Sequence, residues 1–243
     1  MEKLLSMCSS RNRPHYLREM IISFLRTRTK GFTNLIVYVW KDDPQIEEYK
    51  KLSEEFKEIK FIFGKKRFMA EVLNYLSSKY EYDYYQEIND DHYYITEGWD
   101  VKMVKIIEDN GGVGICSPNS NYKHEDYRIM NDKKVFQPSA AIVSGNIVRK
   151  LGCFCLKGLR QIGVDDYLRI LGVEANILYQ PRDIIIEHRC WHVQEKREKD
   201  ENDIFIYEKD GEHGYSLLKK WEETQKKFDL KKIEELKNEK KTN

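Results

Sequence analysis

Residues 84–92, Tyr-Tyr-Gln-Glu-Ile-Asn-Asp-Asp-His, join a short aromatic and apolar run to a cluster of polar side chains. Residues 84–88 predict a central β-strand, and residues 89–92 follow directly after it. In open α/β sheets, ligands bind beyond the carboxyl ends of strands. The adjacent carboxylates of Asp90 and Asp91 repel each other unless a cation neutralises them, and Mg²⁺ or Mn²⁺ prefers such oxygen ligands. For the pair alone, the alternative is a polar turn with a helix cap.

The sequence before this stretch alternates apolar runs with helical patterns. Strands are predicted at residues 4–8, 35–40 and 59–63, and helices from Pro14 onward, over 44–56 and over 68–79. Strands separated by helices of this length indicate βαβ units. We therefore expect an α/β fold with a mostly parallel central sheet.

The sequence after it is less regular. Strands are predicted at 113–116, 135–143, 177–179 and 184–187, and Pro138 makes the second of these an edge strand or a bulged one. Helices are predicted at 99–108, 165–171 and 216–240. More than half of the residues from 195 to 243 are charged, with both signs mixed, as on solvated helix faces. We expect one α/β domain over residues 1–194 and a charged, largely helical C-terminal extension over 195–243.

The composition restricts the function classes. The 243 residues include 42 basic and 41 acidic side chains, a balance that argues against a nucleic-acid coat. The five cysteines are odd in number and match no disulfide framework, which favours reduced thiols and a cytoplasmic location. No apolar run reaches the ~20 residues that a membrane span needs, and no signal peptide is visible.

Basic residues follow the first and third predicted strands. Ser9, Arg11 and Arg13 come directly before Pro14, so two arginines lie at the start of a helix, a place suited to phosphate. The alternative is a solvated basic loop. Residues 65–67 end in Arg67 and form a second basic cluster near the same sheet edge. Basic groups beside acidic groups suit a metal-bound diphosphate.

Further acceptors follow other elements. Asp42 and Asp43, after the second strand, could accept hydrogen bonds from a ribose or base, or cap the next helix. At the start of a helix, one of Asp165 and Asp166 is explained by capping, and the other could act as a general base. His188 ends an apolar strand, where its imidazole could complete a metal shell and favour Mn²⁺; His192 is a second candidate.

Taken together, these segments resemble the nucleotide-sugar glycosyltransferases of the GT-A fold, near the inverting family-two type and its small bacterial and phage-type relatives. The resemblance spans residues 4–192. It is carried, in order, by SSRNRPHYLREMIISFL, VYVWKDDP, EINDDHYYITEGWD, PSAAIVSGNIVRKLGCF, GVDDYLRILG and DIIIEHRCWH.

The resemblance implies a nucleotide-binding half over residues 1–95 and an acceptor-binding half over 96–194. Arg11 and Asp42 or Asp43 would lie along the nucleotide. Asp91 would match the metal-binding last carboxylate of the family's DxD motif, with Asp90 beside it. Asn89 stands where the first aspartate usually stands, a departure that puts the contact at that position in question.

The resemblance also implies the reaction and its partners. Asp165 or Asp166 would be the base, and His188 a late metal or diphosphate contact. The implied activity is metal-assisted sugar transfer, with Mn²⁺ or Mg²⁺, from a nucleoside-diphosphate sugar to a hydroxyl acceptor, with inversion. A UDP-sugar is the first choice of donor.

Other interpretations stay open. A nucleotidyltransferase of related fold normally carries a glycine-rich loop after its first strand, whereas residues 9–13 contain no glycine. Asn89 favours a non-catalytic module that only binds nucleotide sugars. The acceptor is undetermined and includes a modified nucleobase, although nothing else indicates a nucleic-acid partner. The C-terminal helix also leaves a homo-oligomer open.

Overall fold

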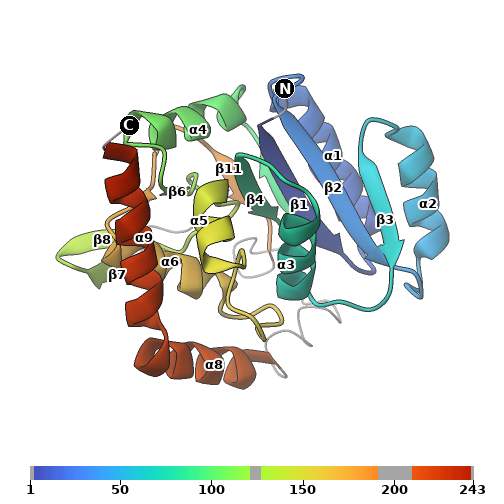
Figure 1. Cartoon of the computed structure of the whole chain (residues 1–243). Helices are drawn as coiled ribbons and strands as arrows, with labels where there is room; N and C mark the ends of the chain where they lie inside the picture. The colour runs from blue at the N-terminus through green and yellow to red at the C-terminus, as the bar shows by residue number, and fades with distance from the viewer. Residues whose placement is uncertain (1–2, 121–126, 191–209, 242–243) are drawn as a thin grey trace.

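The computed structural model describes residues 3–120, 127–190 and 210–241 (Figure 1). Its strands are β1 Leu4–Ser10, β2 Thr33–Trp40, β3 Lys60–Gly64, β4 Tyr84–Ile88, β5 His92–Tyr94, β6 Ile115–Cys116, β7 Tyr127–Met130, β8 Lys133–Phe136, β9 Ile142–Ser144, β10 Leu178–Tyr179 and β11 Ile186–His188. Its helices are α1 Pro14–Thr27, α2 Ile46–Glu55, α3 Met69–Lys79, α4 Trp99–Asp109, α5 Gly145–Leu151, α6 Val164–Glu174, α8 Gly211–Thr224 and α9 Lys226–Lys241.

The main sheet has the strand order β10-β6-β9-β4-β1-β2-β3. Strands β1 to β4 are mutually parallel, and β10 is parallel to β6. Only β9 runs against its two neighbours, β4 and β6. The mostly parallel sheet expected from the sequence is therefore confirmed, and the carboxyl ends of β1 to β4 meet along one edge.

Helices cover both faces of this sheet, because the buried strands are apolar on both sides. On β1, Leu4 and Cys8 pack with α1, α2 and α4, whereas Leu5 and Met7 pack with α3, α5 and α6 on the opposite face. The alternation follows from the two-residue repeat of a strand. Pro14 begins α1, as its fixed φ angle and missing N–H favour.

The predicted strand at 135–143 is wrong: it divides into two strands of different sheets. β8 pairs with β7 in a separate hairpin, while β9 pairs with β4 and β6. Pro138 lies between them, where it has no N–H to give to a continuous ladder.

The single helix predicted at 216–240 is also wrong, because the chain turns at Gln225 between α8 and α9. The indole Nε1 of Trp221 donates a 2.8 Å hydrogen bond to Asp229 Oδ2 and ties the two helices together. Leu218, Trp221 and Ile233 join the hydrophobic core that also contains α6. The extension thus has a buried face beside the solvated one.

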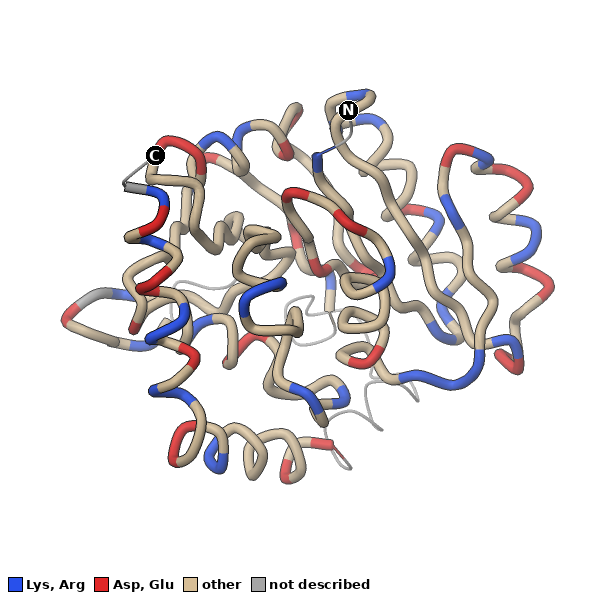
Figure 2. Tube along the Cα trace, viewed as in Figure 1, with Lys and Arg blue, Asp and Glu red and all other residues tan. Residues whose placement is uncertain are grey.

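The surface charges follow the expected pattern. Positive and negative residues alternate along α2, α8 and α9, while the segment between β3 and α3 is basic (Figure 2). All five cysteines are free. None of the helices in the described ranges is long and apolar enough to cross a membrane. The expected domain boundary at residues 194 and 195 lies outside these ranges.

Candidate active site

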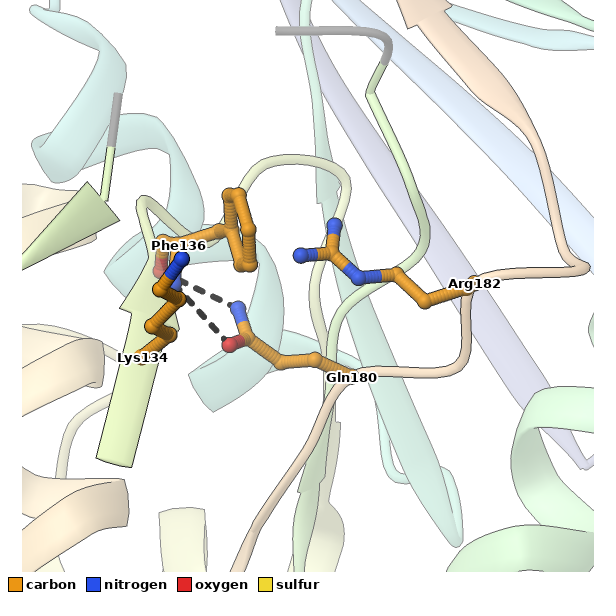
Figure 3. Close-up of a pocket in the computed structure, with 4 residues that line it drawn as sticks. All are labelled: Lys134, Phe136, Gln180 and Arg182. Carbon is orange, nitrogen blue, oxygen red and sulfur yellow. Dashed lines mark hydrogen bonds between the residues drawn. The ribbon is translucent and has the colours of Figure 1, made fainter. Parts of the chain in front are cut away.

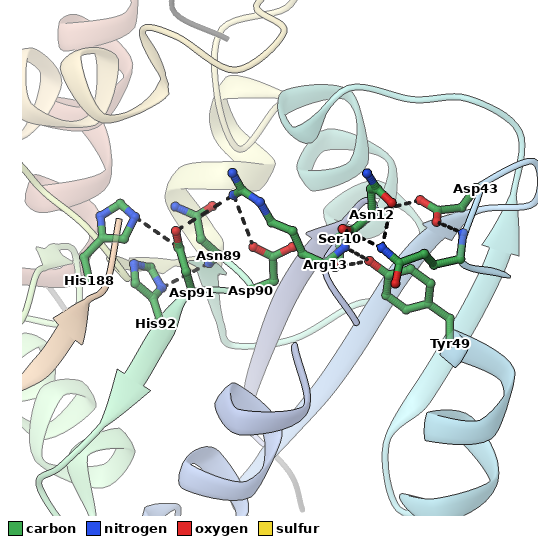
Figure 4. A network of polar contacts seen from close by, with 11 residues as sticks. Ser10, Asn12, Arg13, Asp43, Tyr49, Asn89, Asp90, Asp91, His92 and His188 are labelled. Atoms are coloured by element: carbon green, nitrogen blue, oxygen red, sulfur yellow. Dashed lines mark hydrogen bonds and ion pairs between the residues drawn. The ribbon is translucent and has the colours of Figure 1, made fainter. Parts of the chain in front are cut away.

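A polar network forms where β1 and β4 end side by side (Figure 4). Ser10, the last residue of β1, donates a 2.7 Å hydrogen bond from Oγ to Asp90 Oδ2. Arg13 Nη1 lies 3.8 Å from Asp90 Oδ1 and 3.9 Å from Asp91 Oδ2. All three charged side chains are buried. The arginine thus holds together two carboxylates that would otherwise repel each other.

Asp91 also contacts His188, the last residue of β11, which is far from it in the sequence. β11 pairs with β5 so that His188 lies opposite His92, and Arg189 N donates to the Asp91 carbonyl at 2.9 Å. His188 Nε2 is 3.2 Å from Asp91 Oδ1. Burial by itself would raise the pKa of Asp91, but His188, His92 and Arg13 together hold it well below its usual value.

His92 supports this pair from behind. Its Nδ1 accepts a hydrogen bond from Asn89 N at 3.0 Å, so its proton resides on Nε2, which is 2.9 Å from Ser139 Oγ. Ser139 Oγ lies 3.5 Å from His188 Nδ1. Burial, reinforced by His188, lowers the pKa of His92 to about 3. A neutral His92 therefore orients Ser139, and Ser139 faces the second ring nitrogen of His188.

The loop after β1 is fixed by residues of α2 and of the segment that joins β2 to α2. Asp43 Oδ2 accepts from Asn12 N at 2.9 Å, and its Oδ1 accepts from Gln45 N at 2.8 Å. The Tyr49 hydroxyl accepts from Arg13 N at 2.9 Å and lies 2.7 Å from Ser10 Oγ. Asn12 has φ +55°, a left-handed conformation that asparagine tolerates. These contacts preset the direction of Arg13.

The basic residues predicted to bind phosphate gather around Trp40. The guanidinium of Arg11 lies 4.4 Å from the Trp40 ring centroid, and Lys66 Nζ lies 5.0 Å from it. Trp40 Nε1 donates to the Arg67 carbonyl at 2.7 Å, while the Arg67 guanidinium stacks on Tyr75. These cations line the sheet edge on the β2 and β3 side of the carboxylates.

Ser9 and Asp42 were predicted to lie at the site, but neither contacts the polar network within the described residues. Ser9 precedes Ser10, and its side chain points to the opposite face of β1 because successive strand residues alternate. Asp42 is exposed, whereas Asp43 beside it is buried. Asn89 contributes its backbone N–H to His92. His192 lies outside the residues that the structure describes.

Asp165 and Asp166 have different surroundings in the structure. Asp166 is buried and forms an ion pair with Arg169, and Arg128 Nη1 lies 3.8 Å from its Oδ1. Asp165 instead has Gln137 as a polar neighbour, which lowers its pKa. Burial, with the charge of Asp166, raises the pKa of Asp165 to about 7, although His188 and Arg169 oppose the rise. Asp165 therefore has the pKa of a general base that works near neutral pH.

Glu87 is a second buried carboxyl group, close to Asp165. It lies on β4 with 1% of its surface exposed, and its Oε1 accepts from Ala141 N at 3.3 Å. Burial, together with the charge of Asp165, raises its pKa well above the usual range. The environment of Glu87 thus favours its protonated form more than water does, because two carboxylates close together repel each other.

The start of α6 is held from the C-terminal extension. Asp210 Oδ2 accepts hydrogen bonds from Gln161 N and Ile162 N, both at 2.9 Å. Gly214 packs so closely that an added Cβ would lie 2.3 Å from the Ile162 carbonyl. Gly163, with φ +100°, then begins the helix that carries Asp165. The extension therefore helps to place the candidate base.

The donor set suits a divalent cation only in part. The carboxylate oxygen of Asp91 and the imidazole nitrogen of His188 lie 3.2 Å apart. Both are ligands that Mn²⁺ accepts. Within the described ranges, no group of three or more His, Cys, Asp or Glu residues could hold a metal. A cation here would take two protein ligands and complete its shell with substrate and water oxygens, as Mg²⁺ sites commonly do.

Several members of the network were not predicted. Tyr49, His92 and Ser139 were not candidates, and Ser10 was named only as part of its loop. Ser139 and Tyr49 carry no local signal, because each is brought to the site by strand or helix packing. The period-two alternation of β1 was a usable signal for Ser10: a strand residue that points to the same face as Cys8 reaches the helix α1 side.

Comparisons with known proteins place the fold. Neither a protein-family model nor a curated protein sequence matches the chain. A structure of S. aureus TarS residues 1–349 in complex with UDP-GlcNAc is similar with a TM-score of 0.60 and 12% identity, over 82% of this chain and 60% of that one. The same TarS fragment in complex with UDP gives a TM-score of 0.58 and 11% identity, over 76% of this chain and 59% of that one.

A mannosyltransferase from Pyrobaculum calidifontis, in complex with GDP-Man and Mn²⁺, is similar with a TM-score of 0.59 and 11% identity. That likeness covers 96% of this chain and 73% of the other. The chain spans only about three fifths of the TarS fragment. At these identities the likeness establishes the fold, and the expected GT-A-like architecture is confirmed.

Proposed function

We propose that this chain is a glycosyltransferase that moves a sugar from a nucleoside-diphosphate sugar to an acceptor hydroxyl. The observation that carries the proposal is the site at the ends of β1 and β4. There Arg13, Asp91 and His188 converge beside Asp165, whose pKa is raised to about 7. The three glycosyltransferase structures compared above hold UDP, UDP-GlcNAc and GDP-Man, which supports a nucleotide sugar as the donor.

The nucleotide would lie along the ends of β1 and β2. Arg11 and Arg13 offer charge-assisted hydrogen bonds to a diphosphate, and the ring of Trp40 lies beside Arg11. Asp43 and Asn12 shape the loop that the nucleoside would contact. Because Asp43 is already engaged by two backbone N–H groups, its role is to hold this loop, and the exposed Asp42 is the free acceptor for ribose or base.

Asp165 would act as the base. It takes the proton of the acceptor hydroxyl, whose oxygen bonds to the anomeric carbon as the bond from that carbon to the phosphate oxygen breaks. The nucleoside diphosphate leaves with the bonding electron pair. A single displacement of this kind inverts the configuration at the anomeric carbon. Asp166 is paired with Arg169 and serves to hold α6.

Asp91 and His188 are the residues that would hold Mn²⁺ or Mg²⁺. Such a cation, when bound, offsets the charge that develops on the leaving diphosphate. Arg13, between Asp90 and Asp91, supplies a fixed positive charge on the same side. Asn89, in place of an aspartate, leaves the network with one carboxylate fewer.

The proposal is tested with a panel of UDP-, GDP-, CDP- and dTDP-sugars in the presence of Mn²⁺. Release of nucleoside diphosphate is measured by chromatography for the unmodified chain, for Asp91→Asn and for Asp109→Asn. Asp109 is an exposed matched control at the end of α4, and among the described residues its one ion pair is with Lys105. We expect one sugar nucleotide to be turned over, with a loss in Asp91→Asn and none in Asp109→Asn.

Binding of a sugar nucleotide without any release of product, across several acceptor mixtures, would instead identify a non-catalytic binding module. Transfer of a nucleotidyl group with release of inorganic pyrophosphate would identify a nucleotidyltransferase. Unchanged turnover in Asp91→Asn would remove Asp91 from the mechanism.

A further inference from the structure

A pocket of about 590 Å³ lies between β8 and the segment that follows β10, and it is lined by Lys134, Phe136, Gln180 and Arg182 (Figure 3). β10 is at the opposite end of the main sheet from β2 and β3, near which the nucleotide is proposed to bind. The pocket therefore belongs to the other half of the molecule, and the roles assigned above leave it without an occupant.

The walls of the pocket are fixed by hydrogen bonds. The side chain of Gln180 accepts from Phe136 N at 3.1 Å and donates to the Phe136 carbonyl at 3.0 Å. The guanidinium of Arg182 lies 3.3 Å from the centroid of the Phe136 ring. Both polar groups of Gln180 are thus used in joining the hairpin to the segment after β10. A cavity built in this way needs little rearrangement when it binds a ligand.

The lining of the pocket, as far as the structure describes the chain, is positively charged: it includes Lys134 and Arg182 and no carboxylate. Lys134 Nζ lies 4.5 Å from the Tyr127 ring centroid, so each cation rests on an aromatic face. Among the described residues, neither Lys134 nor Arg182 has an acidic partner. Two exposed cations in a concave site raise the local concentration of anions.

The lining of the pocket is adjacent to the residues around the candidate base. A second, very small cavity shares Phe136, Gln180 and Arg182 with the pocket and is also lined by Ser120 and Gln137. The carboxamide of Gln137 is close enough to Asp165 to lower its pKa and accepts a hydrogen bond from Arg169, and the carbonyl of Ser120 accepts from His188 N at 3.3 Å. The pocket therefore lies on the side of the site where Asp165 lies.

We propose that this pocket binds an acceptor that carries a phosphate or a carboxylate close to the hydroxyl that receives the sugar. Arg182 offers a planar pair of N–H donors and Lys134 a point charge, and both recognise either anion. The ring of Phe136 packs against the guanidinium of Arg182 and helps to hold it in place. This inference rests on the proposed glycosyl transfer, because only then is the bound molecule an acceptor. Binding of an anion in the pocket does not itself require turnover.

The test uses three sugar probes that differ in charge: glucose 6-phosphate, glucuronate and glucose. Calorimetry at low salt measures their binding to the unmodified chain, to Lys134→Gln/Arg182→Gln and to the control Lys102→Gln/Lys219→Gln. The control residues are exposed lysines on α4 and α8. Thermal unfolding checks that all variants fold, and donor binding is measured for each as a separate readout.

We expect at least one anionic probe to bind in the millimolar range or better, with glucose weaker by about tenfold, as the loss of a charge-assisted contact implies. The pocket variant should lose that preference, while the control keeps it. The stronger of the two anions identifies phosphate or carboxylate as the acceptor charge.

Equal binding of glucose and the anions, absence of binding by all three probes, or an unchanged preference in the pocket variant would each overturn the proposal. Failure of the proposed glycosyl transfer gives a different result. In that case no sugar nucleotide is bound or turned over, whereas the charge preference of the pocket is still measured by calorimetry.

Discussion

His188 Nε2 lies 3.2 Å from Asp91 Oδ1, so a residue at the end of β11 completes the acidic turn that follows β4. Behind it, Ser139 Oγ is 2.9 Å from His92 Nε2 and 3.5 Å from His188 Nδ1. Groups that orient a ligating histidine through its second nitrogen influence metal affinity strongly. The contact between Asp91 and His188 is therefore where metal dependence is best probed.

Replacement of Ser139 by alanine should raise the Mn²⁺ concentration needed for half-maximal turnover by about 10–100-fold, because His188 loses the hydroxyl that faces Nδ1. His188→Ala should raise it further. Both are measured by titrating Mn²⁺ into the metal-stripped protein at saturating donor. A half-saturating concentration equal to that of the unmodified chain in both variants would show that His188 is not a ligand.

Asp165→Asn should lower transfer by about 10²–10⁴-fold while donor binding persists, as expected for the loss of a general base. In the unmodified chain the rate should rise with pH and level off above about 7, because burial raises the pKa of Asp165 to about 7 and only the ionised form accepts a proton. The pH–rate profile and nucleotide binding are measured together. A variant that keeps the acidic limb of the profile would place the base elsewhere.

Asp165 should also make folding stability fall with rising pH. Its pKa is raised from 3.8 to about 7 in the folded state, so between these values the folded state binds more protons than the unfolded state. The free energy of unfolding therefore decreases between about pH 4 and pH 7. In Asp165→Asn this decline should flatten, as measured by urea denaturation across the range. The same slope in both proteins would contradict the raised pKa.

Asp166→Ala should destabilise the fold by about 3–5 kcal/mol, because it leaves the buried Arg169 without its carboxylate. The double variant Asp166→Ala/Arg169→Met should recover part of that loss, since the uncompensated charge is gone. Urea denaturation of the two variants decides the matter. A double variant less stable than Asp166→Ala would show that Arg169 has another essential partner.

Tyr49→Phe should lower stability by about 1–2 kcal/mol and weaken donor binding, because Arg13 N loses its acceptor in a buried place. Tyr215→Phe is the matched control, since Tyr215 is 55% exposed. Denaturation and nucleotide titration are compared for both. An equal donor affinity in Tyr49→Phe and the control would mean that the loop after β1 is held without this hydroxyl.

Asp210→Ala should lower kcat more than it raises the KM for the donor, because the start of α6 loses two hydrogen bonds while the nucleotide side is untouched. A loss of stability of about 1–3 kcal/mol accompanies it. Asp109→Ala serves as the exposed control. A change in donor KM alone would show that the C-terminal extension acts on the nucleotide half.

Much of the fold was readable in the sequence. Tyr84–Ile88 was predicted with its observed bounds, and α1 begins at Pro14 as expected, because apolar periodicity and proline act locally. The division of 135–143 into β8 and β9 was not readable, since strand pairing depends on distant partners. The turn at Gln225 was missed for a similar reason: the contact between Trp221 and Asp229 forms only when α9 folds back.

The candidate site was readable as separate pieces. Asp90, Asp91 and His188 were each predicted from their place after a strand. The sequence could not decide which of Asp165 and Asp166 is the better candidate for the general base, because both lie in the first turn of one helix. The buried ion pair of Asp166 with Arg169 separates them in the structure.

The sequence by itself determined the alternating strands and helices, the parallel sheet and the acidic turn after Ile88, because these follow from periodicity and from the chemistry of neighbouring residues. Only the tertiary structure decided that His188 meets Asp91, that Tyr49 accepts from Arg13 N, and that the charged extension supports the start of α6. These contacts join segments far apart in the chain, and their energies depend on burial and packing that no local pattern records.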